Sequence, residues 1–213
     1  MQRRTLLQLV STGLLAPLTA LRYALAEEAT PQQGLRKLKG EVSIDGVVAQ
    51  PGTLIKPGST VSTAPGSEAI YVVGKDAFLQ RGGATVKFES SDVLRVITGR
   101  ILSVFAKGER RIETPTATIG IRGTGCYIEA TDEQVYFCLC YGAADLTPTA
   151  DNAKVERIVT SHHDHPLYIN RGQAMPVMVP ANVINHYDAE LVLLESLVGR
   201  KAPFDTEVAN PYR

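Results

Sequence analysis

Residues 69–105 read AIYVVGKDAFLQRGGATVKFESSDVLRVITGRILSVF, and this stretch decides the fold. Short runs of β-branched and aromatic residues are separated by the turn signals Gly74-Lys75-Asp76, Gly82-Gly83 and Thr98-Gly99. β-branched and aromatic side chains favour strands, whereas Gly and Asp favour the turns between them. Several runs alternate apolar with polar residues, as a sheet with one buried face requires. The stretch therefore predicts consecutive β-strands.

The same pattern continues from Leu35 to Leu146, with a turn signal roughly every ten residues. Strands at this spacing are typical of an all-β domain of the β-sandwich or β-roll kind. We see no pattern that predicts a second independent domain. The domain limits that we expect are an export signal at 1–26, a linker at 27–37, a β domain at 38–146, and a loop, a His-rich segment and a helix at 147–213.

A helix is expected in one place only, at residues 189–198. Asp188 can cap its first turn, and Gly199 can adopt the left-handed conformation that often ends a helix. Its apolar stripe consists of Leu191, Leu194 and Val198. Because such a stripe is buried in most globular proteins, we expect it to dock the C-terminal segment on the sheet. The prediction is thus a single all-β domain of short strands with one C-terminal helix.

The composition is that of an ordinary globular protein. The chain has 213 residues, of which 44% are hydrophobic and 21% are charged, which excludes a wholly disordered chain. Its 22 Lys and Arg residues are balanced by 22 Asp and Glu residues. Because no net positive field exists to hold a phosphate backbone, we expect no nucleic-acid partner.

Residues 1–26 have the features of an export signal. Arg3-Arg4 precedes an apolar stretch over residues 6–20, and Ala24-Leu25-Ala26 is a small-x-small cleavage site. The adjacent arginines favour twin-arginine export, with the general secretory route and an uncleaved amphipathic anchor as alternatives. We therefore expect a periplasmic or secreted protein whose mature form has no stable membrane span.

Four segments carry a resemblance to a known family. They are GEVSIDG at 40–46, LIKPGSTVST at 54–63, GSEAI at 66–70 and IETPTATIGIRGTGCY at 112–127. In this order they resemble the FecR family, the periplasmic β-rich sensor domain of bacterial iron-siderophore signalling. The resemblance covers about residues 38–146, and it implies a β-rich sensing domain.

The signalling members of that family resemble a cytoplasmic segment followed by a transmembrane helix and then this domain. Here the expected export signal precedes the domain directly, so contact with a sigma factor inside the cell is not implied. The resemblance instead implies an exported ligand-binding, sensing or scaffolding module without enzymatic activity. Its partner would be an unknown protein or small ligand in the cell envelope. The alternative is a periplasmic metal-dependent enzyme of unknown substrate.

Three cysteines lie in an expected hairpin. If Asp132-Glu133 forms a two-residue turn, Cys126 lies opposite Leu139 and points away from Cys138 and Cys140, which share one face because side chains alternate along a strand. A one-residue shift of register would place Cys126 opposite Cys138 or Cys140 instead, where a disulfide could form.

Three of the four histidines lie in the run Ser161-His162-His163-Asp164-His165-Pro166, and the fourth is His186. Pro166 favours extended geometry at His165, and in an extended chain His163 and His165 project to the same side. Two thiolates and two imidazoles suit a tetrahedral zinc site or a copper site. The predicted ligands of one zinc or copper ion are Cys138, Cys140, His163 and His165, with His162 as a substitute and Asp164 orienting an imidazole. The alternatives are a Cys126 disulfide and no special chemistry.

Overall fold

The computed structural model describes residues 31–172 and 176–204. Strands make up 51% of the described residues, which confirms the all-β prediction. The expected export signal at 1–26 lies outside the described residues. No helix within the described ranges is long and apolar enough to cross a membrane.

The strands are β1 (Gly34–Lys39), β2 (Val42–Ile44), β3 (Val47–Val48), β4 (Thr60–Thr63), β5 (Glu68–Val73), β6 (Asp76–Arg81), β7 (Thr85–Phe88), β8 (Val93–Val104), β9 (Glu109–Glu113), β10 (Ala117–Arg122), β11 (Gly125–Ala130), β12 (Gln134–Pro148), β13 (Glu156–Thr160), β14 (Leu167–Asn170) and β15 (Met178–Pro180). The helix in the described part of the chain is α2 (Asp188–Leu197).

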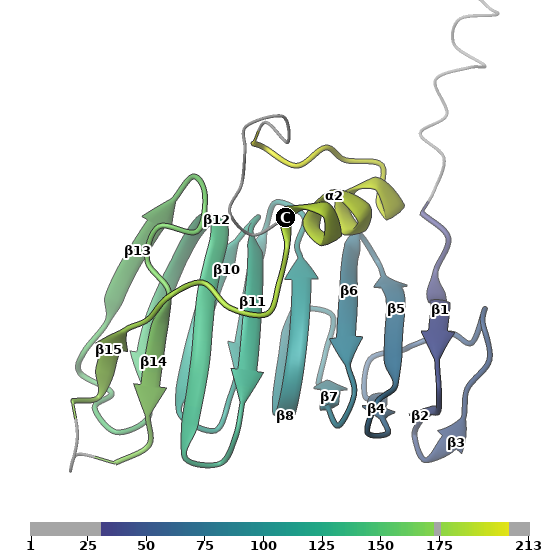
Figure 1. Cartoon of the computed structure of the whole chain (residues 1–213), viewed down its shortest axis with the longest axis horizontal. Helices are drawn as coiled ribbons and strands as arrows, with labels where there is room; N and C mark the ends of the chain where they lie inside the picture. The colour runs from purple at the N-terminus through teal and green to yellow at the C-terminus, as the bar shows by residue number, and fades with distance from the viewer. Residues whose placement is uncertain (1–30, 173–175, 205–213) are drawn as a thin grey trace, which may run out of the picture. The chain divides into compact units, whose positions relative to one another are not determined.

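The strands form two layers, which Figure 1 shows one behind the other. One layer, called the helix-side sheet below, has the strand order β1-β5-β6-β8-β11-β12-β14-β15. The other layer, called the opposite sheet, has the order β3-β2-β4-β7-β8-β9-β10-β12-β13. Neighbours are antiparallel except β8 and β9. Strands β8, β9, β10, β12 and β11 pair in a closed ring, from which the other strands extend.

The long strands β8 and β12 pass from one layer to the other, and each does so at a glycine. Gly99 in β8 has φ +87, and a Cβ there would lie 2.4 Å from the Ala84 Cα. Gly142 in β12 has φ +102, and a Cβ there would lie 2.7 Å from the Thr124 side chain. Only glycine tolerates both the positive φ and the close contact. These two residues therefore let single strands serve both sheets.

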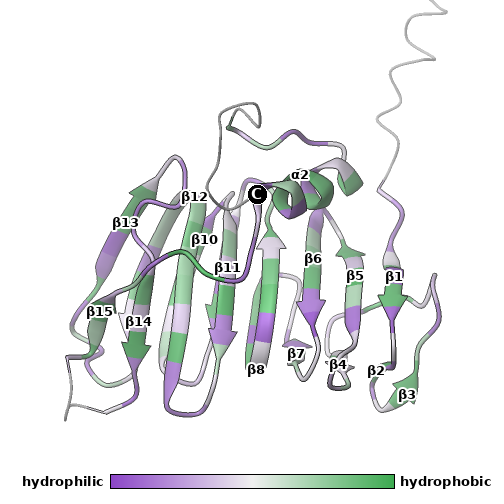
Figure 2. Cartoon of the chain, in the orientation of Figure 1, coloured by the Kyte–Doolittle hydropathy of each residue, from purple (hydrophilic) through white to green (hydrophobic). Residues whose placement is uncertain are grey.

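Two apolar cores result from this arrangement. The main core fills the space between the sheets and includes an aromatic group of Tyr71, Phe78, Phe88 and Phe105. The second core lies between α2 and the outer face of the helix-side sheet. Leu191, Leu194 and Val198 are buried in it, which confirms the predicted docking of the helix stripe. Figure 2 shows apolar residues on α2 and along the strands beneath it.

Some limits differ from the sequence-based expectations. Strand β1 begins at Gly34, inside the expected linker, because Leu35 is fully buried in the main core. Strand β12 continues to Pro148, and β13, β14 and β15 add to the sheets a region expected to hold only a loop, a His-rich segment and a helix. The helix N-cap is Tyr187 rather than Asp188, whereas Gly199 has the expected left-handed conformation, with φ +71.

Candidate metal centre

The β11–β12 hairpin determines which way each cysteine points. Cys126 lies opposite Leu139, in the register that the two-residue turn predicts. Cys126 consequently faces the main core, whereas Cys138 and Cys140 face outward into the second core under α2. All three cysteines are free and buried. The alternative of a disulfide between Cys126 and Cys138 or Cys140 is therefore wrong, because the side chains lie on opposite faces of the sheet.

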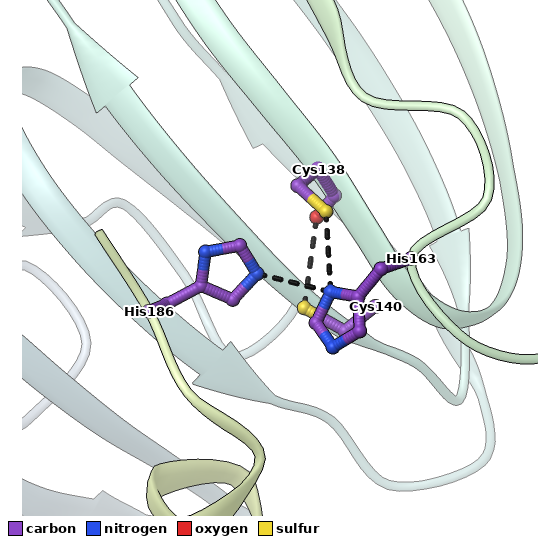
Figure 3. A group of neighbouring side chains, drawn as sticks. All are labelled: Cys138, Cys140, His163 and His186. Carbon is purple, nitrogen blue, oxygen red and sulfur yellow. Dashed lines mark hydrogen bonds between the residues drawn. The ribbon is translucent and has the colours of Figure 1, made fainter. Parts of the chain in front are cut away.

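Four ligating side chains converge beneath α2, and we call them the Cys/His cluster: Cys138, Cys140, His163 and His186 (Figure 3). Their ligating atoms all lie within 4.8 Å of one another. The Cys138 Sγ lies 3.4 Å from the His163 Nδ1, and the His186 Nε2 lies 3.1 Å from the same nitrogen. The cluster joins strand β12, the turn after β13 and the segment before α2.

Three of the four predicted ligands are brought together, but His165 is not. His163 has a left-handed backbone conformation, with φ +51, and its N–H donates to the Cys140 carbonyl oxygen over 3.0 Å. The extended geometry on which the prediction of His165 rested is therefore absent. His165 is exposed and lines a surface groove with Pro166 and Leu167.

His186 takes the position that was expected for His165. Asn185, with φ +57, turns the chain just before it. The His186 ring is 1% exposed and stacks on Tyr127, with ring centroids 4.5 Å apart. Its Nδ1 donates to the Ile184 carbonyl oxygen over 2.6 Å, which leaves Nε2 directed at the cluster. The sequence analysis did not predict His186 as a ligand. Its position just before the expected helix, which docks on the sheet, was the feature that could have indicated it.

The carboxylate that orients an imidazole is Asp188 and not Asp164. The His163 Nε2 lies 3.1 Å from one oxygen of Asp188, and the His162 Nε2 lies 3.0 Å from the other. His162 thus lies in the shell around the cluster rather than within it. Asp164 accepts hydrogen bonds from the Thr160 hydroxyl and the Ser161 N–H instead, and these bonds lower its pKa.

The two thiols of the cluster differ in the direction in which their pKa values are shifted. A hydrogen bond from Cys140 lowers the pKa of Cys138 despite burial, and hydrogen bonds with His163 and His186 add to this effect. Burial raises the pKa of Cys140. Burial alone would lower the pKa of His163, but Cys138 and Asp188 outweigh it and raise that pKa. The surroundings of the cluster therefore favour the ionised form of Cys138 and the protonated form of His163.

Two separations within the cluster can be compared with those of tetrahedral coordination. With metal bonds of about 2.3 Å to sulfur and about 2.05 Å to nitrogen, tetrahedral angles place a sulfur and a nitrogen about 3.6 Å apart and two nitrogens about 3.3 Å apart. The corresponding separations here are 3.4 Å and 3.1 Å. Both separations are about 0.2 Å shorter than the tetrahedral values, and the four residues form a group that could hold a metal ion.

No protein-family model matches this chain, and no curated protein matches it. Two crystal structures, at 1.65 and 2.50 Å resolution, of a candidate anti-sigma factor from Parabacteroides distasonis are similar to part of it. Each gives a TM-score of 0.47 at 14% sequence identity and covers 58% of this chain. The chain matches 59% of the length of that protein.

Proposed function

We propose that this protein is an exported, non-enzymatic sensing or scaffolding module that holds one zinc or copper ion between Cys138, Cys140, His163 and His186. The observation that carries this proposal is the orientation of the two buried imidazoles. Each directs one ring nitrogen into the Cys/His cluster and donates from the other nitrogen to an acceptor outside it. Metal-binding histidines are held in the same way, by an outer acceptor that determines the tautomer.

The tautomers also direct two ring lone pairs toward each other inside the cluster. The Ile184 carbonyl can only accept, so the His186 Nδ1 carries a hydrogen and the Nε2 of the neutral ring carries a lone pair. The Asp188 carboxylate likewise accepts from the His163 Nε2, which leaves a lone pair on Nδ1 of the neutral ring. Two lone pairs and the Cys138 sulfur then face one another over 3.1–3.4 Å. A proton or a metal ion must lie among them, and four soft and imidazole donors favour the metal.

The closed form of the site favours a structural or sensing role over catalysis. Cys138 and Cys140 are 0% exposed, His163 is 8% exposed and His186 is 1% exposed. A zinc ion with four protein ligands has no open position for water or substrate, whereas catalytic zinc keeps one. The alternative of a metal-dependent enzyme therefore receives no support from this geometry.

The support for export and for a sensing role comes from the amino-acid sequence. The features of residues 1–26 support export, and the resemblance of residues 38–146 to the FecR family supports a sensing module in the cell envelope. Replacing Arg3 and Arg4 together with lysine should retain a twin-arginine substrate in the cytoplasm, as cell fractionation would show. Unchanged export would indicate the general secretory route.

A second candidate function rests on one specific observation. Cys138, His163 and Asp188 form a relay in which the imidazole contacts the thiol through Nδ1 and the carboxylate through Nε2. A Cys–His–Asp relay can activate a thiolate nucleophile for acyl transfer. Because Cys138 is 0% exposed beneath α2, a substrate would reach it only after α2 had moved.

Elemental analysis of untagged protein tests the first proposal against the second. We expect close to one equivalent of zinc or copper in the wild type and little in His186→Ala. His165→Ala is the matched control, because it removes an exposed histidine from the same chain, and it should keep its metal. A wild type with substoichiometric metal whose Cys138 alone is alkylated by iodoacetamide would contradict the metal site and support the nucleophile.

A further inference from the structure

We infer that the metal ion acts as a latch, which through His186 fastens the C-terminal cap to the helix-side sheet and keeps the apolar face of that sheet covered. The C-terminal cap consists of residues 181–200, which are α2 and the segments beside it. This inference rests on the proposed function, because it requires an ion in the Cys/His cluster. It adds a regulatory consequence, since removal of the ion would release the cap.

The connection between the ion and the cap is short. His186 lies two residues before Asp188, the first residue of α2. Asp188 itself accepts hydrogen bonds from His162 and His163. The start of α2 is therefore connected to two ligands. His186 lies just before it in the chain, and Asp188, its first residue, holds His163 by a hydrogen bond. Cys138 and Cys140 belong to β12, and His163, in the turn after β13, donates its N–H to the Cys140 carbonyl oxygen of β12.

The helix needs this attachment because it is short. It has ten residues, whereas isolated helices shorter than about 12–15 residues are marginal in water. Its other attachments include the buried Leu191 and Leu194, an ion pair of 2.5 Å between Glu190 and Arg81, and a hydrogen bond from the Tyr141 hydroxyl to Glu195. The cap is also held by hydrogen bonds from the Tyr136 hydroxyl to the Asn182 carbonyl oxygen, from the Asn185 amide to Glu129 and from Arg200 to the Lys75 carbonyl oxygen. The side chains of Arg81 and Glu190 are 20% and 19% exposed, and Arg81 also forms an ion pair with Glu68.

The face beneath the cap is strongly apolar. Besides the cap side chains, the second core contains Ile70, Val72, Ala77, Leu79, Leu102, Val104, Tyr127, Tyr136, Cys138, Cys140 and Tyr141, all from the helix-side sheet. These side chains point away from the main core, so the cap is what separates them from water. An uncapped protein would thus expose a continuous apolar surface, which soluble proteins rarely do without a purpose.

The ligands differ in how freely they can move apart. The His186 Nε2 lies 3.1 Å from the His163 Nδ1. His186 can leave this arrangement by moving with the cap, whereas Cys138 and Cys140 are held in β12. The cap is accordingly the part of the site that is able to move.

Hydrogen exchange on the full chain tests the latch, in metal-loaded, chelated and zinc-reloaded protein. We expect chelation to speed exchange at α2 by at least about tenfold and zinc to restore protection, because an undocked short helix unfolds locally. Exchange at β4 and β7 in the opposite sheet should not change. Binding of a fluorescent apolar dye should rise and fall with exchange at α2.

A variant separates coordination from packing. His186→Phe keeps an aromatic ring to stack on Tyr127 but removes the ligating nitrogen, so α2 should exchange rapidly with or without chelator. His165→Phe is its control and should behave as the wild type. If the His186 variant does not fold, chelation of the wild type still decides the question.

The outcomes distinguish the two proposals. Metal present in the wild type, with α2 exchange unchanged by chelation, would overturn the latch and leave the metal site in place. Faster exchange throughout both sheets would also overturn it, since the ion would then stabilise the whole domain. A wild type without metal would remove the proposed function and the latch together.

Discussion

Replacing Cys140 with serine should remove most of the metal-dependent stability of this protein, whereas the same replacement at Cys126 should leave it unchanged. Both residues are 0% exposed and both lie in the β11–β12 hairpin. They differ in the face on which they lie, since Cys126 belongs to the main core and Cys140 to the second core. The pair therefore compares one chemical change with and without loss of a ligand.

The magnitude follows from linkage. At a free zinc concentration about 1,000 times the Kd, a bound ion stabilises the folded state by about 4.1 kcal/mol. For a domain of this size 1 kcal/mol shifts the Tm by about 2–4 °C, so chelation should lower the Tm of the wild type and of Cys126→Ser by about 8–16 °C.

Removing a residue that holds a ligand in place weakens metal binding by about 10–100-fold. Removing a ligand itself should weaken metal binding by more than this. With a 100-fold weaker site at the same free zinc, the stabilisation of Cys140→Ser falls to about 1.4 kcal/mol or less, and the shift on chelation to about 3–6 °C. The cost of burying a serine hydroxyl, about 1–3 kcal/mol, occurs in both variants and cancels when loaded and chelated forms are compared.

The assay is thermal unfolding in a zinc buffer that holds the free metal constant, repeated after addition of a chelator. Each variant is compared with itself, so its own loss of stability does not affect the result. Equal shifts on chelation in Cys126→Ser and Cys140→Ser would refute ligation by Cys140. A shift lost from Cys126→Ser alone would place the metal in the main core.

Three further predictions concern the surroundings of the cluster. Asp188→Asn should lower zinc affinity by about 10–100-fold, measured by competition with a chromophoric chelator, because the amide holds the His163 Nε2–H less strongly; unchanged affinity would show that Asp188 does not support the ligand. Leu194→Ala should destabilise the protein by about 2–5 kcal/mol in denaturant unfolding, because this side chain is 0% exposed, and a near-zero change would contradict its packing under the helix. In chelated protein the pKa of Cys138 is lowered and that of His163 is raised. The contribution of Cys138 to the free energy of unfolding is therefore lost as the pH falls through its lowered pKa, and the contribution of His163 is lost as the pH rises through its raised pKa. Their ion pair should accordingly be present at neutral pH as an ultraviolet thiolate absorbance that Cys138→Ser lacks, and a neutral thiol there would contradict it.

The strand-rich region up to β12, the helix and the shared face of Cys138 and Cys140 could be predicted from the sequence because each depends on local geometry, whereas β13, β14 and β15 were not predicted. Turn residues interrupt the chain between β-branched runs, the stripe of α2 repeats at the helical period, and alternate residues of a strand face the same way. Each of these features depends on residues that are close in the chain.

The choice between His165 and His186 could not be predicted in this way. The local rule placed His163 and His165 on one side, but His163 adopts a left-handed conformation while its N–H bonds to the Cys140 carbonyl of a strand 23 residues earlier. His186 reaches the cluster only because α2 docks on the outer face of the helix-side sheet and carries the preceding segment with it. The sequence by itself thus determined the strand-rich region up to β12, the helix and which donors are present. Which donors meet was decided by the tertiary structure, because that depends on the packing of segments that are distant along the chain.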